Sequence, residues 1–181
     1  MDKQILHYQI IEKLGQGGMG IVYKALDTRL KREVAIKFLP GHIADNEEEN
    51  QRFENEAQAS AALNHLNIAH IYSIEDADNQ KFIVMEYVPG IELKEYLKNN
   101  TPSINEIVSI FKQLTEGMRE AHSKGITHRD IKSANIMIAE NGIPKIMDFG
   151  IAKFKGSAQV TKVGTTLGTT SYMSPEQARS E

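Results

Sequence analysis

The residues of this chain best suited to chemistry lie in two short stretches of its second half, 128–135 and 148–150. Asp130 can accept a proton from a hydroxyl nucleophile, and Lys132 can offset negative charge that develops beside it. Asn135 and Asp148 supply oxygen ligands of the kind that Mg²⁺ prefers. Phosphoryl transfer needs these groups, because its catalysis depends mainly on positioning and charge neutralisation.

A glycine cluster in the first half could approach phosphate groups. Gly15, Gly17 and Gly20 follow the pattern G-x-G-x-x-G, and glycine lets backbone N–H groups come close to an anion. The same pattern opens dinucleotide-binding folds, but there a helix follows it. Here strand-like residues follow at 21–25 and 33–39, so we expect a hairpin that covers a nucleotide. Taken alone, the motif is better explained as a glycine-rich turn without function.

A lysine and a glutamate could form a second charged pair. Lys37 ends the strand-like run Val-Ala-Ile-Lys, where a lysine often only extends its stem toward solvent. Alternatively its ammonium group binds phosphates and is held by a carboxylate. We choose Glu56, on the helix expected after Lys37, as that carboxylate. The acidic residues 47–49 fit a solvated helix start, where negative charge is favourable.

The elements that must position these residues change character along the chain. The first part predicts five strands and one helix, and Pro89-Gly90 marks the expected boundary. The strands are expected at 8–14, 21–25, 33–39, 69–75 and 81–87, and the helix at 47–64. The second part predicts helices at 92–98 and 103–124, with short strands at 136–138 and 145–147.

The helix expected at 103–124 carries clear start and stop signals. Ser103 and Glu106 have the spacing of a capping box, and Gly125 suits the C-terminal cap. Its apolar residues recur at helical spacing, which predicts an amphipathic helix with one apolar face. That face is expected to contain Ile107, Phe111, Leu114 and Met118.

Composition places the chain among ordinary globular proteins. It has 181 residues, 40% hydrophobic and 25% charged, and a net charge of −3, which gives no sign of nucleic-acid binding. The absence of cysteine excludes disulfides and thiolate metal sites. We find no signal peptide and no apolar run long enough to span a membrane, so a cytoplasmic location is expected. A membrane anchor in a longer parent protein stays open.

Taken together, the motifs resemble the catalytic domain of eukaryotic-type (Hanks-type) serine/threonine protein kinases. The segment Gly-Thr-Thr-Ser-Tyr-Met-Ser-Pro-Glu at 168–176 is especially similar to the corresponding segment of bacterial members. The resemblance runs from Tyr8 to Ala178. It implies an α+β, two-lobed fold: an N-terminal lobe at 1–88, with a five-stranded antiparallel sheet and one helix, and a partial helical lobe at 89–181.

The resemblance assigns the nucleotide site. Adenine would hydrogen-bond the backbone of Glu86 and Val88, and Met85 would be the gatekeeper side chain. Hydrophobic residues would enclose the adenine ring, and the glycines and Lys37 would bind phosphates. The implied ATP-binding set is Leu14, Gly15, Gly17, Gly20, Val22, Ala35, Lys37, Met85, Glu86, Val88 and Met137.

The resemblance also assigns the catalytic roles. Asp130 would orient and deprotonate the hydroxyl, Lys132 would stabilise the transferring group, and Glu56 would hold Lys37. Asn135 and Asp148 would bind two Mg²⁺ ions, and ATP would be the phosphoryl donor. Thr169 would contact Asp130 and Lys132, and the candidate phosphorylation sites in the loop before it are Thr161, Thr165 and Thr166. Implied partners are proteins with Ser or Thr hydroxyls, and a second copy during autophosphorylation.

The chain departs from the family in two places. Ser174 replaces the alanine of the A-P-E motif, and the arginine that would pair with Glu176 is missing. We therefore expect a fragment of a longer kinase, with an exposed apolar stripe on the helix at 103–124. A non-catalytic binding module is the alternative. A small-molecule phosphotransferase is less favoured, because the loop at 169–176 resembles one that binds peptides.

Overall fold

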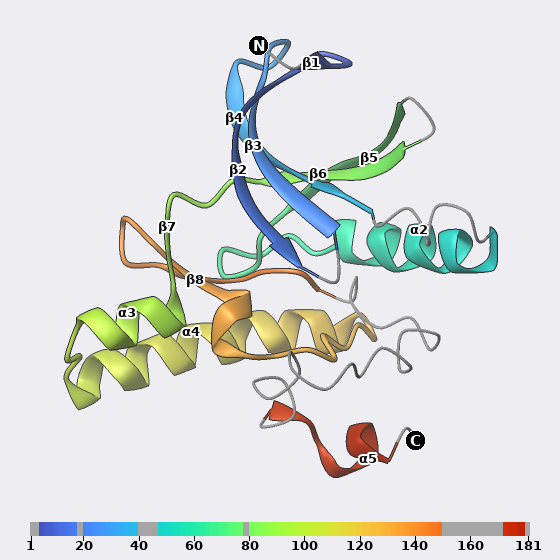
Figure 1. Ribbon diagram of the computed structural model, residues 1–181. Coiled ribbons are helices and arrows are strands. Elements are labelled where there is room, and N and C mark those ends of the chain that lie inside the picture. Colours follow the sequence, from blue (N-terminus) through green and yellow to red (C-terminus); the bar gives the residue numbers. More distant parts are fainter. Residues whose placement is uncertain (1–3, 18–19, 40–46, 78–79, 150–171, 180–181) are drawn as a thin grey trace. The chain divides into compact units, whose positions relative to one another are not determined.

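The computed structural model describes residues 4–17, 20–39, 47–77, 80–149 and 172–179. The chain forms two compact units, Met1–Pro89 and Gly90–Glu181. Strands dominate the first unit and helices the second, as Figure 1 shows. The predicted α+β class is confirmed.

The first unit contains a six-stranded antiparallel sheet in the order β1-β2-β3-β4-β6-β5. Five strands match predicted ones, and the structure adds the two-residue strand β1, which pairs with Tyr8 and Gln9. A strand this short leaves no alternation for sequence analysis to detect. The strands are β1 (Gln4–Ile5), β2 (Tyr8–Gly17), β3 (Gly20–Asp27), β4 (Arg32–Phe38), β5 (Ile71–Ala77) and β6 (Gln80–Glu86).

One face of this sheet carries the hydrophobic core of the unit. Side chains alternate between the two faces of a strand, so alternate residues of β3, β4 and β6 meet on the same side. Phe82 is fully buried there, and its ring meets those of Tyr8 and Phe38 at centroid distances of 6.3 and 5.2 Å. The buried members of the cluster are Tyr8, Ala25, Val34, Ile36, Phe82 and Val84.

Helix α2 (Glu47–Ala61) packs against β5 within the first unit. Phe53 and Ala57, four residues apart, are fully buried, as helical spacing on one face requires. The helix ends three residues before the predicted end. The N–H groups of Ala62 and Leu63 donate to carbonyls three residues back, which tightens and closes the last turn.

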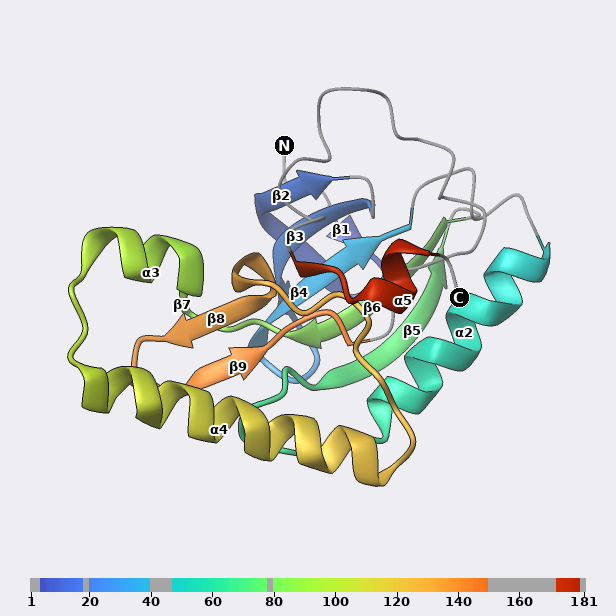
Figure 2. The ribbon, with the colours of Figure 1, turned by 90° about the horizontal axis from the view of Figure 1, so that it is seen from below.

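The second unit joins a small sheet to helices. Its strands β7 (Gly90–Glu92), β8 (Ile136–Ala139) and β9 (Pro144–Ile146) are antiparallel in that order. Its helices are α3 (Leu93–Asn99), α4 (Ile104–Ser123) and the short α5 (Pro175–Ala178), with a 3-10 turn at Ser133–Asn135. Helix α4 packs along β9, a contact that Figure 2 shows from below.

Strand β7 was not predicted, and its pairing depends on a glycine. A Cβ at Gly90 would lie 2.2 Å from the carbonyl oxygen of Ile138 on β8, so no larger residue fits. All three residues of β7 are exposed, and an exposed three-residue strand has no apolar alternation. Proline and glycine at 89–90 therefore mark a close strand contact as well as the boundary between the units.

The predicted ends of α4 are confirmed. Ser103 accepts the N–H of Glu106 while Glu106 accepts the N–H of Ser103, which completes the capping box. At the other end Gly125 has a φ of +73°, a left-handed conformation that favours glycine.

The apolar face predicted for α4 is only partly the face that packs inward. Leu114 is buried, but Phe111 is 59% exposed. The residues that pack inward include two small ones and are Ile110, Leu114, Gly117 and Ala121. Small residues let the helix approach the sheet closely, so they displaced the larger apolar side chains that the hydrophobic pattern favoured.

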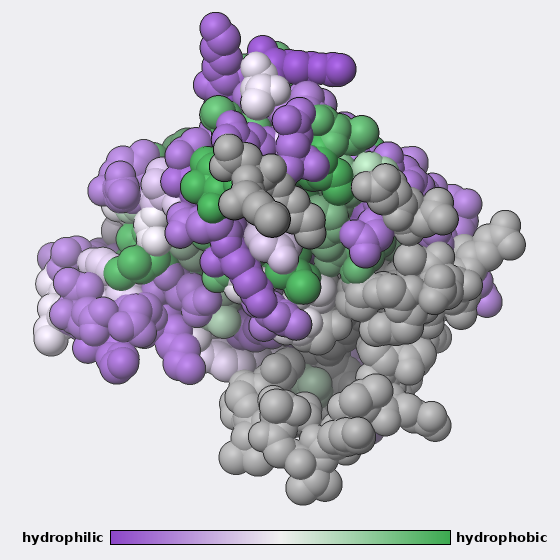
Figure 3. All heavy atoms as spheres, turned by 45° about the horizontal axis from the view of Figure 1, so that its top comes forward, coloured by the Kyte–Doolittle hydropathy of each residue, from purple (hydrophilic) through white to green (hydrophobic). Residues whose placement is uncertain are grey.

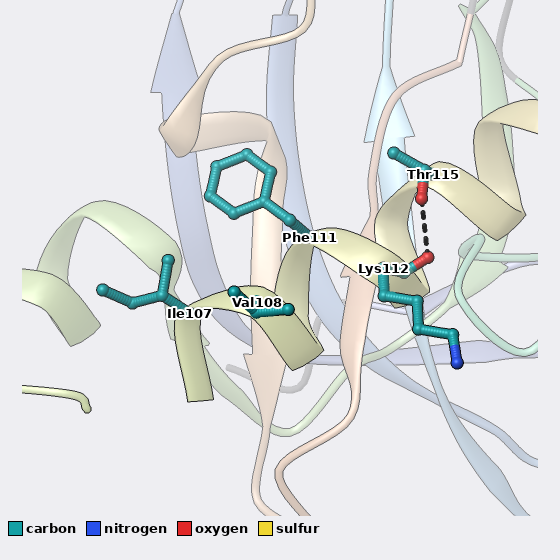
Figure 4. A pocket seen from close by; sticks show the side chains of 5 residues that line it. All are labelled: Ile107, Val108, Phe111, Lys112 and Thr115. Carbon is teal, nitrogen blue, oxygen red and sulfur yellow. Dashed lines mark hydrogen bonds between the residues drawn. The ribbon is translucent and has the colours of Figure 1, made fainter. Parts of the chain in front are cut away.

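An apolar surface therefore lies on the outer side of α4. Figure 4 shows Ile107, Val108 and Phe111 side by side on it, with Lys112 and Thr115 at one end. The Thr115 hydroxyl donates to the carbonyl of Lys112 at 2.8 Å and is turned back onto the helix. We call the surface formed by these five residues the α4 outer face. The predicted exposed apolar stripe is present: Phe111 and its neighbour Val108 are more than half exposed.

The surface of the first unit differs from the α4 outer face. Over its strands, Figure 3 shows hydrophobic residues in small groups separated by hydrophilic ones. Across the described ranges, no helix combines the length and the hydrophobicity needed to cross a membrane.

Candidate functional site

The residues predicted to bind nucleotide in the first unit share one face of the sheet. Strand register places Val22, Lys37 and Ile83 in one row, and Lys24, Ala35 and Met85 in the next. These rows alternate with those of the hydrophobic core, so they lie on the opposite face. Val22, Ala35, Lys37 and Met85 are thereby brought together from three strands.

Most of these residues are well packed. Ala35, Lys37, Met85 and Val88 are each at most 5% exposed. Leu14 is 44% exposed and lies where the pairing of β2 with β3 shifts register. A bulge of this kind bends a strand, so the chain turns away from regular pairing just before the glycine cluster.

The glycines of the cluster differ in what they require. Gly20 has a φ of +109°, a conformation that few other residues adopt. At Gly15 and Gly17 a Cβ would meet no described atom within 4 Å. Packing within the described chain therefore does not explain glycine at 15 and 17, whereas close approach of a ligand to the backbone does.

Lys37 and Glu56 both lie in buried surroundings in the first unit. Lys37 is only 3% exposed, and the Oε2 atom of Glu56 is buried. Buried charges are stable only when they are paired or hydrogen-bonded, which suits an ammonium and a carboxylate that act together. Glu54 has a different role, because its Oε1 binds the Nζ of Lys81 on β6.

The segment 86–88 is anchored at its first residue. The N–H of Glu86 donates to the carbonyl of His70 at 2.8 Å, and the Glu86 carboxylate accepts the N–H of His70 at 3.2 Å. The His70 ring in turn lies 3.1 Å from the carbonyl of Leu63 through Nδ1. This network, which was not predicted, fixes the end of β6.

In the second unit, Asp130 stands at the centre of a buried polar cluster. It is 6% exposed, and its Oδ2 lies 2.8 Å from the Nζ of Lys132. The Nδ2 of Asn135 donates to the same Oδ2 at 2.9 Å and to the Asp130 carbonyl at 2.8 Å. The structure thus brings together three of the predicted site residues. The short turn Ser133–Asn135 between them sets their spacing.

His128 organises the backbone around this cluster. Its Nε2 lies 2.8 Å from the carbonyl of Met147 and must donate to it, and its Nδ1 accepts the N–H of Asp130 at 3.2 Å. The two contacts together require a neutral imidazole, because a protonated ring would have no nitrogen left to accept the N–H of Asp130. Burial lowers the pKa of His128, although the Met147 carbonyl and the nearby Asp148 and Asp130 act in the opposite direction. The ring also packs against Phe149 at 4.7 Å between centroids.

Asp148 directly follows Met147, whose backbone N–H and carbonyl groups are both hydrogen-bonded. The N–H of Met147 donates to the carbonyl of Asn135 at 2.9 Å, and its carbonyl accepts from His128. Asp148 itself has a φ of +55° and Arg129 one of +64°, conformations unusual for residues with a side chain. Such strain persists only where the surroundings impose it, and it is typical of functional sites.

The oxygen atoms of Asn135 and Asp148 fit a cation that takes few ligands from the protein. Because Asn135 directs both of its N–H contacts at Asp130, its Oδ1 is the atom that could bind a metal, together with Asp148. Among the described residues no group of three or more His, Cys, Asp or Glu could hold a metal ion. Two protein ligands are enough for Mg²⁺, which usually keeps waters and takes substrate phosphates as further ligands.

Some predicted residues are not grouped with these clusters. Met137 lies half-buried on β8, opposite Glu92 and Lys145. Thr161, Thr165, Thr166 and Thr169 lie outside the described residues.

Two contacts near the site were missed. The Ser133 hydroxyl lies 3.1 Å from the Tyr172 hydroxyl, and Lys24 contacts Tyr87. Neither pair has a spacing that sequence analysis could read, since 39 residues separate the first pair.

The chain belongs to the protein kinase family. The model of the protein kinase domain matches residues 8–181. The serine/threonine-protein kinase PrkC of Bacillus subtilis is 45% identical over 173 residues, which cover 95% of this chain and 27% of that protein. The serine/threonine-protein kinase PknB of Mycolicibacterium smegmatis is 40% identical over 181 residues, which cover 96% and 29%.

A solved kinase domain has a similar fold. The PknI kinase domain of Mycobacterium tuberculosis aligns with a TM-score of 0.73 at 27% identity, over 84% of this chain and 63% of that one. The chain spans less than a third of the length of PrkC and of PknB, the two curated relatives named above. The resemblance seen in the sequence is confirmed at the level of family and fold. Protein kinases use ATP and a divalent metal and act on proteins.

Proposed function

We propose that this chain carries the catalytic residues of an ATP-dependent serine/threonine protein kinase. The observation that supports this best is the buried Asp130 carboxylate, held by Lys132 and Asn135 at 2.8 and 2.9 Å. The relatives named above, which are serine/threonine-protein kinases, support the same assignment.

The contacts of Asp130 support a separate role for each of its carboxylate oxygens. Oδ2 is engaged by Lys132 and Asn135, so Oδ1 is the atom that we assign to accept the proton of a Ser or Thr hydroxyl. The positive charge of Lys132 would offset the negative charge of the transferring phosphoryl group.

We assign nucleotide-binding roles to residues one by one, as the sequence resemblance implies. In the first unit, Leu14, Val22, Ala35, Met85 and the backbone of Glu86 and Val88 would bind adenine, and Lys37, Gly15, Gly17 and Gly20 would bind phosphates. Met137 is kept as a further residue that would contact adenine. Glu56 would hold Lys37 in place. We assign Mg²⁺ to Asn135 and Asp148, where it would neutralise charge on the phosphates.

Regulation by phosphorylation belongs to the same proposal. We keep Thr161, Thr165 and Thr166 as candidate sites, Thr169 as a substrate-loop residue, and transfer between two copies as the route. Arg129, which precedes Asp130, would bind a phosphothreonine through its guanidinium group.

Mass spectrometry after incubation with Mg-ATP tests the proposal. Wild-type protein should gain phosphate, and Asp130→Asn should slow the reaction by about 10²–10⁴-fold, the usual contribution of a general base. Asparagine keeps the size of the side chain but cannot accept the proton. Lys98→Met, an exposed change on α3, is the matched control and should react as wild type does. Equal phosphorylation of wild type and Asp130→Asn, or none in either, would contradict the proposal and favour a binding module.

A further inference from the structure

Tyr87, the middle residue of the segment 86–88, is held by a charged side chain from the sheet. The Nζ of Lys24 lies 4.4 Å from the centre of the Tyr87 ring. The same Nζ contacts the Oε1 of Glu33 at 2.8 Å. All three residues belong to the first unit.

The sheet dictates this arrangement. Lys24 on β3 lies opposite Ala35 on β4, in the row that continues to Met85 on β6. Glu33 lies two residues before Ala35 and therefore on the same face, at the diagonal position from Lys24. Glu33 thus holds the ammonium group on the face assigned to adenine, close to the end of β6.

The Lys24 ammonium is well placed to stay charged and ordered. Its side chain is 17% exposed, whereas that of Glu33 is 49% exposed. The hydrogen bond to Glu33 raises the pKa of Lys24 against the opposing effect of burial, and the phenol group of Tyr87 raises it further. As a mere surface ion pair, Lys24–Glu33 would contribute little. Its contact with the aromatic ring gives it a further role.

We propose that Lys24 is a positioning residue for adenine, because its contact with Tyr87 fixes the backbone of Glu86 and Val88 before the nucleotide binds. His70 anchors Glu86, and Val88 is buried, so Lys24 supplies the third fixed point of this segment. A segment ordered in advance loses less conformational freedom on binding, and affinity rises accordingly. The inference rests on the proposed function, since that function assigns adenine to this segment.

Calorimetric titration of the purified protein with adenosine and with ADP tests the inference. Lys24→Met removes the charge but keeps the stem, and should weaken both ligands by about three- to tenfold, as a partly exposed cation–π contact would. Lys24→Arg keeps the cation and should restore affinity to within about twofold of wild type. Lys98→Met removes one exposed lysine from the second unit and should change nothing.

Adenosine separates positioning from simple charge attraction. It carries no phosphate, so loss of a distant positive charge would weaken ADP and spare adenosine. Tyr87→Leu should weaken adenosine as much as Lys24→Met does, and the double variant should be no weaker than either, because the two side chains act as one unit. Thermal unfolding of each variant checks that affinity is compared among folded proteins.

Each outcome bears on a different claim. Unchanged adenosine affinity in Lys24→Met, a loss confined to ADP, or failure of Lys24→Arg to restore binding would overturn the positioning role. Additive losses in the double variant would do so as well. If wild-type protein binds neither adenosine nor ADP, the proposed function fails, and the inference with it.

Discussion

The two units hold their functional residues by different physical means. In the first unit, sheet register and packing position the residues: Val22, Ala35 and Lys37 share a face because the opposite face is a hydrophobic core. In the second unit, hydrogen bonds position them: His128 and Asn135 connect Asp130 to the backbone beside Asp148. A packed sheet fixes which residues meet, whereas a polar network also fixes protonation and tautomer. The following predictions test this contrast.

The largest effect is expected from a core truncation in the first unit. Phe82→Ala removes a fully buried ring from the sheet core and should lower the free energy of unfolding by about 3–5 kcal/mol. If the units unfold separately, hydrogen exchange should rise in β2, β3, β4 and β6 and stay unchanged around Asp130. Phe82→Leu, which keeps most of the volume, is the control and should cost less. Equal loss of protection in both units would show that they unfold as one.

A pH effect is expected in the second unit. In the folded protein His128 is neutral and its pKa lies below the usual 6.5, mainly because of burial. Below pH 6.5 the unfolded chain therefore binds a proton that the folded chain excludes. The free energy of unfolding should fall with decreasing pH, by at most about 1.4 kcal/mol per pH unit from this residue.

Comparison with His128→Gln isolates the effect. Urea unfolding of both proteins between about pH 5 and pH 7.5 spans the range in which histidine titrates. Glutamine does not titrate, so the variant should lose stability less steeply below pH 6.5. Identical slopes would mean that His128 takes up its proton in the folded protein, and that its network is not selective for the neutral ring.

The same contrast explains what could be predicted from the sequence. Five strands of the first unit are short runs of strand-forming residues bounded by turn residues, and the capping residues of α4 act on neighbours only three residues away, so these elements could be predicted directly. The contact of His128 with Met147 joins residues 19 apart and uses a backbone acceptor, which no spacing rule can identify. Motif resemblance identified Asp130, Lys132 and Asn135, but not the geometry that connects them.

The difference between the apolar face predicted for α4 and the face that packs inward has another cause. Hydrophobic periodicity weights large side chains, and α4 carries apolar residues on two adjoining stripes. The structure buries the stripe that contains Gly117 and Ala121, because short side chains allow the closest approach to β9. A pattern based on hydrophobicity alone cannot choose between two such stripes. The choice depends on how near the helix can come to the sheet.

A moderate effect is expected at the start of α4. Ser103→Ala removes the side chain that accepts the N–H of Glu106 and should cost about 1 kcal/mol in the free energy of unfolding. Ser103→Asn, another good cap, should retain most of that stability. Urea unfolding of both variants measures the difference. A loss as large with Asn as with Ala would show that the cap does not stabilise this helix.

The smallest effect on stability is expected on the α4 outer face. Phe111→Ser replaces a side chain that is 59% exposed, and serine and phenylalanine have similar helix propensities, so stability should change by less than about 0.5 kcal/mol. The neighbouring Ile110→Ser is the matched control: Ile110 is 8% exposed, and its loss should cost several-fold more. Phe111→Ser should also reduce self-association, measured by sedimentation, because it interrupts an exposed apolar surface. A cost for Phe111→Ser equal to that for Ile110→Ser would mean that both stripes of α4 are covered in solution.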